Sequence, residues 1–379
     1  MPEQDIKAND KKNPILIRVR RLHLHDATSQ DILTQARYFR QLGRQVSIYA
    51  AHVPLELQSD VVSLAFADDL LRNKETIVIH HFNGFDADLP YFLRKNRGKS
   101  ILRYHNITPS KWFWKYSIKS ALYSILGTIQ VKLCVALGRF DLVLTPSIFN
   151  LKGLFSCLPK RILPAGHLFP IVIDLAEFTA KSKRTLIPSN QRTAIFVGRF
   201  APNKCLDYFL DFLSEWNISQ LKTRAKFTLK VIIAGKIGAE FSAYYKDLLA
   251  RANSLGLAQQ LLFQINPSRD DILNLYSSSD VFLSFSEHEG FLVPILEAQA
   301  AGLPVLAAQQ PAVAETLGTS GVIVARDKKV FKTTAEECLK ILSDQSYNQT
   351  ITALGKQNLQ RFDPITICKN ALEAIDGCP

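Results

Sequence analysis

Short apolar segments alternate with segments of helical spacing along almost the whole chain. A first series of apolar runs occupies residues 14–19, 45–50, 76–80, 100–104 and 141–145. A second series follows residue 190, at 194–197, 229–234, 261–264, 281–284, 304–307 and 322–324. Helical spacing fills several of the intervals, as at 32–42, 206–216 and 294–301. Strands that alternate with helices of this length predict βαβ units, and therefore an α/β protein with parallel sheets covered on both faces.

The two series of strands predict two domains. A chain of 379 residues is longer than a single hydrophobic core usually supports, and the polar segment 181–192 separates the series. We predict two doubly wound, Rossmann-like domains of similar size, at 1–185 and 186–355, that face a central cleft. Residues 356–379 are expected to form a C-terminal helix that crosses back to the first domain. Ligands in such folds bind beyond the carboxyl ends of the strands, here in the cleft.

The positive charge of the chain is confined to its N-terminal half. The formal charge is +12, from 46 Lys and Arg against 34 Asp and Glu. Residues 1–185 hold 27 basic and 15 acidic side chains, whereas the remaining residues hold 19 of each. No acidic residue occurs between Asp88 and Asp141, where ten basic residues lie. This asymmetry predicts an anionic partner for the first domain, such as a nucleic acid, a phosphate compound or an acidic membrane surface.

Three further features predict a cytoplasmic protein. The N-terminus, residues 1–13, is polar and has no apolar segment typical of a signal peptide. The most apolar stretch, 118–137, contains Lys119, Gln130 and Lys132, and on that ground we expect no membrane span. The six cysteines show no CxxC spacing, which favours reduced thiols and indicates no zinc site.

The segment 286–298 (SEHEGFLVPILEA) is the most informative motif of the chain. It follows a predicted strand and enters a helix whose first turn contains Pro294, a favoured position for proline. The backbone N–H groups of residues 290–293 are then unpaired at a helix start and can hold an anion. Glu289 is placed to hold sugar hydroxyls, and Glu297 to accept hydrogen bonds from a ribose diol. A glutamate in the first turn is equally explained by the helix dipole.

A second motif, 196–204 (FVGRFAPNK), carries two cations at a strand-to-helix crossover. Arg199 follows the glycine at the strand end, and Lys204 begins the next helix. Two cations in this position suit a diphosphate, which they would bind through charge-assisted hydrogen bonds. The alternative is a solvated basic loop.

Together, VGRFAPNK (197–204) and EGFLVPILEAQAAGLPV (289–305) resemble the retaining glycosyltransferases of family 4, which have the GT-B fold and an E-x7-E motif. The resemblance is specific over about residues 190–310 and, in its general layout, covers nearly the whole chain. It implies that Arg199 and Lys204 bind the donor diphosphate, Glu289 the sugar and Glu297 the ribose. Further donor contacts are implied for Gly290, Phe291 and Leu292, for the glycine loop at Gly235, and for the nucleobase at Ile265 and Asn266.

In the first domain, the family's usual glycine pair is replaced by residues 24–30 (LHDATSQ), where Thr28 and Ser29 could donate hydroxyl hydrogen bonds to the donor. His105 ends a predicted strand and is expected to point into the cleft. It resembles the family's histidine beside the transferred sugar, which makes His105 and Glu289 the candidate catalytic residues. A capping or structural histidine is the alternative.

Residues 111–116 (KWFWKY) combine cations with large aromatic side chains. Lys111, Trp112, Trp114 and Lys115 could bind a membrane interface or a lipid-linked acceptor. Two other interpretations are a packed helix with wet lysines and stacking on single-stranded nucleic acid.

The sequence therefore predicts a retaining hexosyltransferase that uses a UDP- or GDP-linked sugar and a saccharide or lipid-linked acceptor, in polysaccharide or glycoconjugate synthesis. We expect it on the inner face of the membrane, as a peripheral protein with no nucleic-acid partner. Asp86-Ala87-Asp88 is a short match to a metal-binding motif that chance produces often. The resemblance implies that cations and helix N-termini stabilise the leaving diphosphate, so no cofactor or metal is expected. The alternatives are a sugar-nucleotide epimerase, a phosphorylase of related fold, and a non-enzymatic module that binds nucleic acid or membrane.

Overall fold

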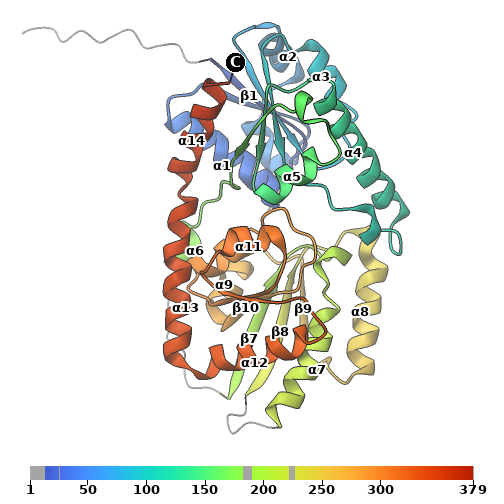
Figure 1. The fold of residues 1–379 in the computed structure, drawn as a ribbon, viewed down its shortest axis with the longest axis vertical. Helices are drawn as coiled ribbons and strands as arrows, with labels where there is room; N and C mark the ends of the chain where they lie inside the picture. The colour runs from blue at the N-terminus through green and yellow to red at the C-terminus, as the bar shows by residue number, and fades with distance from the viewer. Residues whose placement is uncertain (1–12, 25, 182–189, 222–226, 379) are drawn as a thin grey trace, which may run out of the picture.

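The computed structural model describes residues 13–24, 26–181, 190–221 and 227–378. Two six-stranded parallel sheets, each covered by helices, form the upper and lower halves of Figure 1. This is the predicted GT-B arrangement of two Rossmann-like domains. Residues 1–12, for which the sequence predicted no signal peptide, lie outside the described residues. So do residues 182–189, most of the predicted segment between the domains.

The first sheet has the order β2-β1-β3-β4-β5-β6. Its strands are β1 (Ile15–Arg21), β2 (Val46–His52), β3 (Ile77–Phe82), β4 (Lys99–Tyr104), β5 (Leu142–Thr145) and β6 (Ala165–Leu168). The helices of this part of the chain are α1 (Ala27–Gln41), η1 (Leu55–Asp60), α2 (Leu64–Arg72), α3 (Leu89–Lys95), η2 (Ser110–Trp112), α4 (Ile118–Ala136), α5 (Ile148–Phe155), η3 (Lys160–Ile162) and α6 (Ala176–Ala180).

The second sheet has the order β12-β11-β10-β7-β8-β9. Its strands are β7 (Gln191–Val197), β8 (Thr228–Gly235), β9 (Leu261–Ile265), β10 (Val281–Ser284), β11 (Val305–Ala308) and β12 (Val322–Val324). Its helices are η4 (Pro202–Lys204), α7 (Tyr208–Gln220), η5 (Ala239–Phe241), α8 (Ser242–Ser254), α9 (Arg269–Ser278), α10 (Pro294–Ala300), α11 (Pro311–Leu317), α12 (Val330–Ser343), α13 (Gln345–Asn358) and η6 (Leu359–Phe362).

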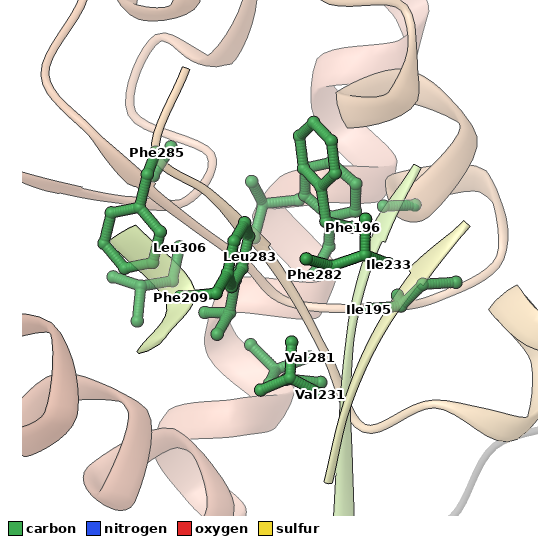
Figure 2. Close-up of a cluster of buried hydrophobic side chains, with 14 of the residues drawn as sticks. Ile195, Phe196, Phe209, Val231, Ile233, Val281, Phe282, Leu283, Phe285 and Leu306 are labelled. Carbon is green, nitrogen blue, oxygen red and sulfur yellow. The ribbon is translucent and has the colours of Figure 1, made fainter. Parts of the chain in front are cut away.

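Apolar side chains on both faces of the second sheet explain its stability. Figure 2 shows side chains of β7, β8, β10 and β11 together with Phe209 of α7 in one buried cluster. Strands buried on both faces read as continuous apolar runs, which is why the sequence predicted them well. Both sheets reverse their strand order once, between β1 and β3 and between β7 and β10. Such reversals leave a crevice at the carboxyl ends of the strands, and this is where the motifs lie.

The last helix, α14 (Pro364–Asp376), returns to the first domain. In Figure 1, α13 and α14 run along one side of the molecule from the lower domain to the upper one. Ile367, Ala371 and Ile375 are buried in the core that α1 and the first sheet form. The carboxylate of Asp376 accepts hydrogen bonds from Arg44, at 2.7 and 3.0 Å.

Two features of the first domain differ from the sequence analysis. Strand β6 was not predicted, because its sequence AGHL has no apolar run and it lies at the sheet edge, half-buried or exposed. By length and hydropathy alone, the stretch 118–136 meets a criterion for a membrane span that the sequence analysis expected it to fail. Among the described residues, α4 is a 19-residue helix apolar enough to cross a membrane, and 28% of the stretch is buried. A core helix of a soluble protein meets the same criterion.

Helix α4 approaches the loop after β3 closely at Gly127. A Cβ atom on Gly127 would lie 2.6 Å from the backbone nitrogen of Phe85 and 2.9 Å from the carbonyl carbon of Gly84. These neighbours are backbone atoms, which cannot move without shifting the loop. Gly127 therefore fixes the distance between α4 and the carboxyl end of β3.

We expect Gly127→Ala to lower the free energy of unfolding by about 1–3 kcal/mol, because the added methyl group overpacks a backbone contact. Gly153→Ala is a matched control, since Gly153 also lies in a helix but an added Cβ meets nothing within 4 Å. The control should be neutral or more stable by about 0.5–1 kcal/mol. Urea unfolding of both variants measures this, and equal stabilities would contradict the close packing.

Candidate functional site

The two motifs meet at the strand reversal of the second sheet. The segment after β7 carries Gly198 to Lys204, and the segment after β10 carries Phe285 to Val293. Strands β7 and β10 are hydrogen-bonded neighbours, so both segments leave the same edge of the sheet. The backbone N–H of Glu287 donates to the carbonyl of Asn203 at 3.0 Å and joins the segments directly.

Lys204 and Glu289 form an ion pair between these two segments. The Nζ atom of Lys204 lies 2.6 and 2.8 Å from the two carboxylate oxygens of Glu289. Both side chains are mostly buried, with 16% and 8% of their surfaces exposed. The predicted diphosphate-binding cation and the predicted sugar-binding carboxylate thus neutralise each other in the structure.

The backbone between β10 and α10 is held by its carbonyl groups. The carbonyls of His288 and Glu289 accept from Asn203 Nδ2 at 3.0 Å and Gln310 Nε2 at 3.3 Å. The next two, of Gly290 and Phe291, accept from Ser147 Oγ at 3.0 Å and Thr316 Oγ1 at 2.5 Å.

The N–H groups of residues 290–293 have no hydrogen-bond acceptor among the residues that the structure describes. Leu292 has a positive φ of 66°, and its side chain and those of its neighbours Phe291 and Val293 are buried. A peptide segment whose carbonyls are all bonded and whose N–H groups are free can accept an anion.

Arg199 remains available for a ligand. Its side chain is exposed, and it has no partner among the described residues. It lines a cavity of about 600 Å³ between the domains. The other walls come from the loop after β3, the segment 107–124 and η5.

Glu297 is buried in α10 and bound by two side chains. The hydroxyl of Tyr276 donates to its Oε2 at 2.9 Å, and Arg269 Nη1 lies 3.8 Å from Oε1. Burial raises the pKa of Glu297, while Tyr276 and Arg269 act in the opposite direction. These contacts fix the orientation of the Glu297 carboxylate, and its role as a ribose contact stays a prediction beside the helix-dipole interpretation.

Gly235, Ile265 and Asn266 lie together at the ends of β8 and β9. Gly235 pairs with Ile265, and the N–H of Asn266 donates to the Gly235 carbonyl at 2.9 Å. A Cβ atom on Gly235 would lie 1.9 Å from the carbonyl oxygen of Gly198. The glycine is thus required for the close approach of β7 and β8, a structural reason that holds without any ligand.

Ser29 is not available as a donor of hydrogen bonds to a ligand, contrary to the expectation for residues 24–30. It is buried, and its hydroxyl donates to Asp26 Oδ2 and accepts from the N–H of His23, both at 2.9 Å. Asp26 is the N-cap of α1, and its Oδ1 accepts from the backbone N–H of Ser29 at 2.9 Å. Thr28 is half-buried in the first turn of α1 and stays a predicted ligand contact.

The ring of His105 points into the first domain rather than into the cleft, and that expectation was wrong. Its Nε2 lies 2.8 Å from His81 Nδ1, and His81 Nε2 lies 2.9 Å from Gln35 Oε1. The N–H of His105 still pairs with Phe82, so the chain turns one residue later, at Asn106 with φ of 74°. The main chain of His105 faces the cleft instead, since a Cβ on Gly290 would lie 2.9 Å from its carbonyl oxygen.

Asp31, His81 and His105 offer ligand atoms within 4.8 Å of one another, a spacing that could hold a metal. Each atom already has a protein partner: Asp31 Oδ2 binds Arg103 at 3.1 and 3.2 Å, and Oδ1 accepts from Val172 N–H at 2.6 Å. An arginine inside the set disfavours a cation. Asp86 is likewise paired with buried Arg18. Metal independence stays a prediction.

Most aromatic side chains of residues 111–116 pack against the second domain, as the packing interpretation had it. Trp112 and Tyr116 pack against the hydrophobic core that contains the second sheet, and the ring centre of Phe113 lies 5.7 Å from that of Phe241. Lys115 pairs with Asp247 at 3.1 Å, and Lys111 lies over the Trp112 ring. Trp114 is half exposed.

Sequence reasoning missed the side chains that hold the site residues in place. Asn203, Gln310 and Thr316 fix the loop, and Tyr276 and Arg269 hold Glu297. Only Asn203 lies inside one of the two motifs, 196–204 and 286–298. Gln310 before Pro311 marks a helix start, and its Oε1 caps α11 through Val313; the contact with Glu289 depends on the tertiary fold.

Residues 177–358 match the family model described as glycosyl transferases group 1. A D-inositol 3-phosphate glycosyltransferase of Mycolicibacterium smegmatis is 31% identical over 160 residues, 40% of this chain and 34% of that protein. A GDP-mannose:cellobiosyl-diphosphopolyprenol alpha-mannosyltransferase of Xanthomonas oryzae pv. oryzae is 32% identical over 175 residues, 45% of this chain and 43% of that protein. The aligned part thus spans less than half of either relative.

Structural similarity extends over the whole chain. The crystal structure of Anabaena Alr3699/HepE in complex with UDP-glucose has a TM-score of 0.70 and 16% sequence identity, and covers 96% of this chain and 99% of that one. At this identity the likeness establishes the GT-B fold.

We expect the buried imidazoles to make stability depend on pH. Burial lowers the pKa of His81 and of His105 well below 6.5. Below about pH 6.5 the unfolded chain therefore binds more protons than the folded protein does. The free energy of unfolding, which has its full value above pH 7, then falls by about 1 kcal/mol per pH unit for each imidazole. Urea unfolding between pH 7.5 and 5 measures the slope.

His81→Gln should make that slope shallower, whatever its effect on stability at pH 7.5. His52→Gln is the control, because His52 is exposed. An unchanged slope in His81→Gln would show that the cluster does not resist protonation.

Proposed function

Residues 177–358 match the model of the group 1 glycosyl transferases, and from this match we propose that the chain is a retaining hexosyltransferase. It would transfer a hexose from a nucleoside diphosphate sugar to a saccharide or lipid-linked acceptor. The observation that carries the proposal is the crevice at the β7–β10 reversal, where Lys204, Glu289 and the free N–H groups of residues 290–293 converge.

In this proposal the donor replaces the partner of Lys204. The diphosphate takes the ammonium group of Lys204 and the guanidinium of Arg199, together with the N–H groups of Phe291 and Leu292. Glu289 is released from Lys204 and accepts hydrogen bonds from the sugar hydroxyls. Because the ion pair is mostly buried, the exchange conserves charge pairing in a region where an unpaired ion is costly.

The remaining predicted donor contacts fit along the same sheet edge. Glu297, oriented by Tyr276, would accept from the ribose diol. Ile265, 37% exposed, and Asn266 lie beside Gly235 and would face the nucleobase. His105 would act through its main-chain carbonyl, which faces Gly290.

The chemistry required of these residues is stabilisation of a departing diphosphate and an oxocarbenium-like centre. The bond from the anomeric carbon to the diphosphate oxygen breaks, and the acceptor oxygen bonds to the same face of that carbon. The acceptor proton passes to the departing phosphate oxygen. Arg199 and Lys204 neutralise the charge that develops, so no bound metal is needed in this scheme.

The proposed donor and acceptor classes are supported by the names of similar proteins. One relative is named for GDP-mannose and a diphosphopolyprenol acceptor, and the Anabaena structure was solved with UDP-glucose. Both are hexose donors, so UDP and GDP sugars remain the two alternatives. The polyprenol acceptor of the relative supports a lipid-linked acceptor here, and with it a position at the inner face of the membrane.

A thermal-shift screen with UDP, GDP and ADP tests nucleotide binding. A nucleotide at 100 times its Kd stabilises the folded protein by about 2.7 kcal/mol, a rise of a few degrees in Tm. Arg199→Gln should reduce the rise, whereas Lys246→Gln, which removes an exposed cation from α8, should not. No shift with any of the three nucleotides would contradict the proposed function.

Glu289→Gln and Lys204→Gln should separate binding from transfer. Glu289→Gln leaves Lys204 without its anion, so we expect nucleoside diphosphate affinity to be unchanged or higher while turnover falls by about 100-fold or more. Lys204→Gln should lower both the affinity for the nucleoside diphosphate and the turnover. The measurements are calorimetric binding and release of UDP or GDP from the sugar nucleotide that the screen selects.

The double variant Lys332→Gln/Glu336→Gln removes an exposed ion pair in α12 and should behave as wild type. Near-normal turnover in either site variant would refute the assignment.

A further inference from the structure

Helix α4 exposes a continuous apolar stripe. Six aliphatic side chains are 46–64% exposed: Ile118, Leu122, Leu126, Ile129, Leu133 and Leu137. Their spacing of four, four, three, four and four residues places them on one face of the helix and its C-cap. Tyr123, 43% exposed, lies beside the stripe, and Trp114 is exposed just before the helix. In Figure 1, α4 runs along the outer side of the upper domain.

The opposite face of α4 is fixed to the protein, so the stripe cannot turn inward. Ala121, Ser124, Gly127, Val131 and Val135 are the buried residues of the helix. Ser124 Oγ donates to the carbonyl of Thr108 at 2.5 Å, and Gly127 leaves no room against the loop after β3. A helix that is apolar on both faces, with one face packed, presents the other to something other than water.

Basic side chains border the stripe on both sides. At 100° per residue, Lys119 and Lys132 fall at the two edges of the stripe, on opposite sides of its centre. Lys119 lies over the ring of Tyr123, and Lys132 donates to Ser156 at the surface. No acidic residue occurs between Asp88 and Asp141, so no carboxylate lies on this helix.

We propose that the outer face of α4 docks in the interface of an anionic lipid bilayer, with the helix axis parallel to the membrane. Aliphatic side chains enter the acyl region while Lys119 and Lys132 contact lipid phosphates. The packed inner face of α4 rules out a spanning orientation in the folded domain. Spanning would expose Gly127 and Val131 to lipid and would break the contact between Gly127 and the loop after β3. Anionic lipid is favoured over a second copy of this chain because the stripe is bordered by like charges, which repel across a two-fold interface.

This surface moves the predicted membrane contact from residues 111–115 to the next helix. It also places one wall of the interdomain cavity beside the bilayer, since Ser117, Lys119, Ser120 and Tyr123 of this helix region line the cavity together with Arg199. A lipid-linked acceptor lying in the membrane would reach the diphosphate-binding cation without leaving the interface. That part of the inference rests on the proposed function, whereas the docking surface does not.

Vesicle flotation of the full chain tests the docking surface. Wild type should float with vesicles of 70% phosphatidylcholine and 30% phosphatidylglycerol at low salt, and less at high salt or with phosphatidylcholine alone. Leu126→Glu/Leu133→Glu should weaken binding at least about tenfold, because it inserts charge into the stripe. Lys119→Gln/Lys132→Gln should weaken it about 30-fold toward anionic vesicles.

Ile218→Glu/Leu255→Glu is the matched control. It makes the same change of charge at side chains 47% and 45% exposed in the second domain, against 46% and 55% for Leu126 and Leu133. It should float as wild type does. The Tm rise with UDP or GDP, measured on every variant, reports the fold and the donor site separately from the membrane.

Should the glutamate variant fail to fold, Leu126→Trp replaces it. Its fluorescence should shift to the blue and be quenched by brominated lipid, while Ile218→Trp should show neither change.

Absence of wild-type flotation at low salt, or wild-type flotation by Leu126→Glu/Leu133→Glu, would overturn the proposal. So would a lipid-free dimer that the glutamates dissociate, since the stripe would then be a protein interface. A nucleotide-induced Tm rise that persists in these cases would leave the proposed function standing.

Discussion

The arrangement of the site depends on how the backbone between β10 and α10 is held. Four successive carbonyls, from His288 to Phe291, accept hydrogen bonds from Asn203, Gln310, Ser147 and Thr316. In a trans peptide the N–H points away from the carbonyl of the same unit. The bonds to the carbonyls of residues 289–291 therefore turn the N–H groups of residues 290–292 away from those donors, and these N–H groups have no acceptor among the described residues. The backbone, rather than a flexible side chain, thereby presents donors in a fixed geometry, which is what transition-state stabilisation requires.

One of those four donors, Ser147, comes from the other domain. It precedes α5, whose first N–H groups, of Ile148 and Phe149, donate to the carboxylate of Glu315 at 2.6 and 2.8 Å. The start of an N-terminal-domain helix is thus neutralised by an acid of the C-terminal domain. Lys236 adds a third link, to the carbonyl of Leu24 at 2.6 Å. The bond from Ser147 to the Gly290 carbonyl therefore exists only while the two domains are in contact.

The sequence could predict those parts of the site that depend on residues close together along the chain. Arg199, Lys204, Glu289 and Glu297 follow buried strands or lie one turn into a helix, so local pattern and resemblance assigned them to one site. Of the four, the structure joins Lys204 and Glu289 directly. The orientation of His105 depends on the chain turning at Asn106 rather than one residue earlier, a choice that strand periodicity does not determine. The residues that hold the site, such as Gln310 and Thr316, act across 21 and 25 residues through the fold, and no local pattern marks them.

The charge asymmetry illustrates the same limit. Several cations of the N-terminal half are internal, because Arg18, Arg103 and Arg44 are buried and paired with Asp86, Asp31 and Asp376. The surplus therefore does not measure the charge of a binding face. The binding face is indicated instead by two features together: residues 89–140 contain no acidic residue, and α4 carries the exposed apolar stripe. Electrostatic attraction falls off within a Debye length and is weakened by salt, whereas the apolar stripe fixes depth and orientation. The helix thus supplies the specificity, and the surrounding charge the attraction.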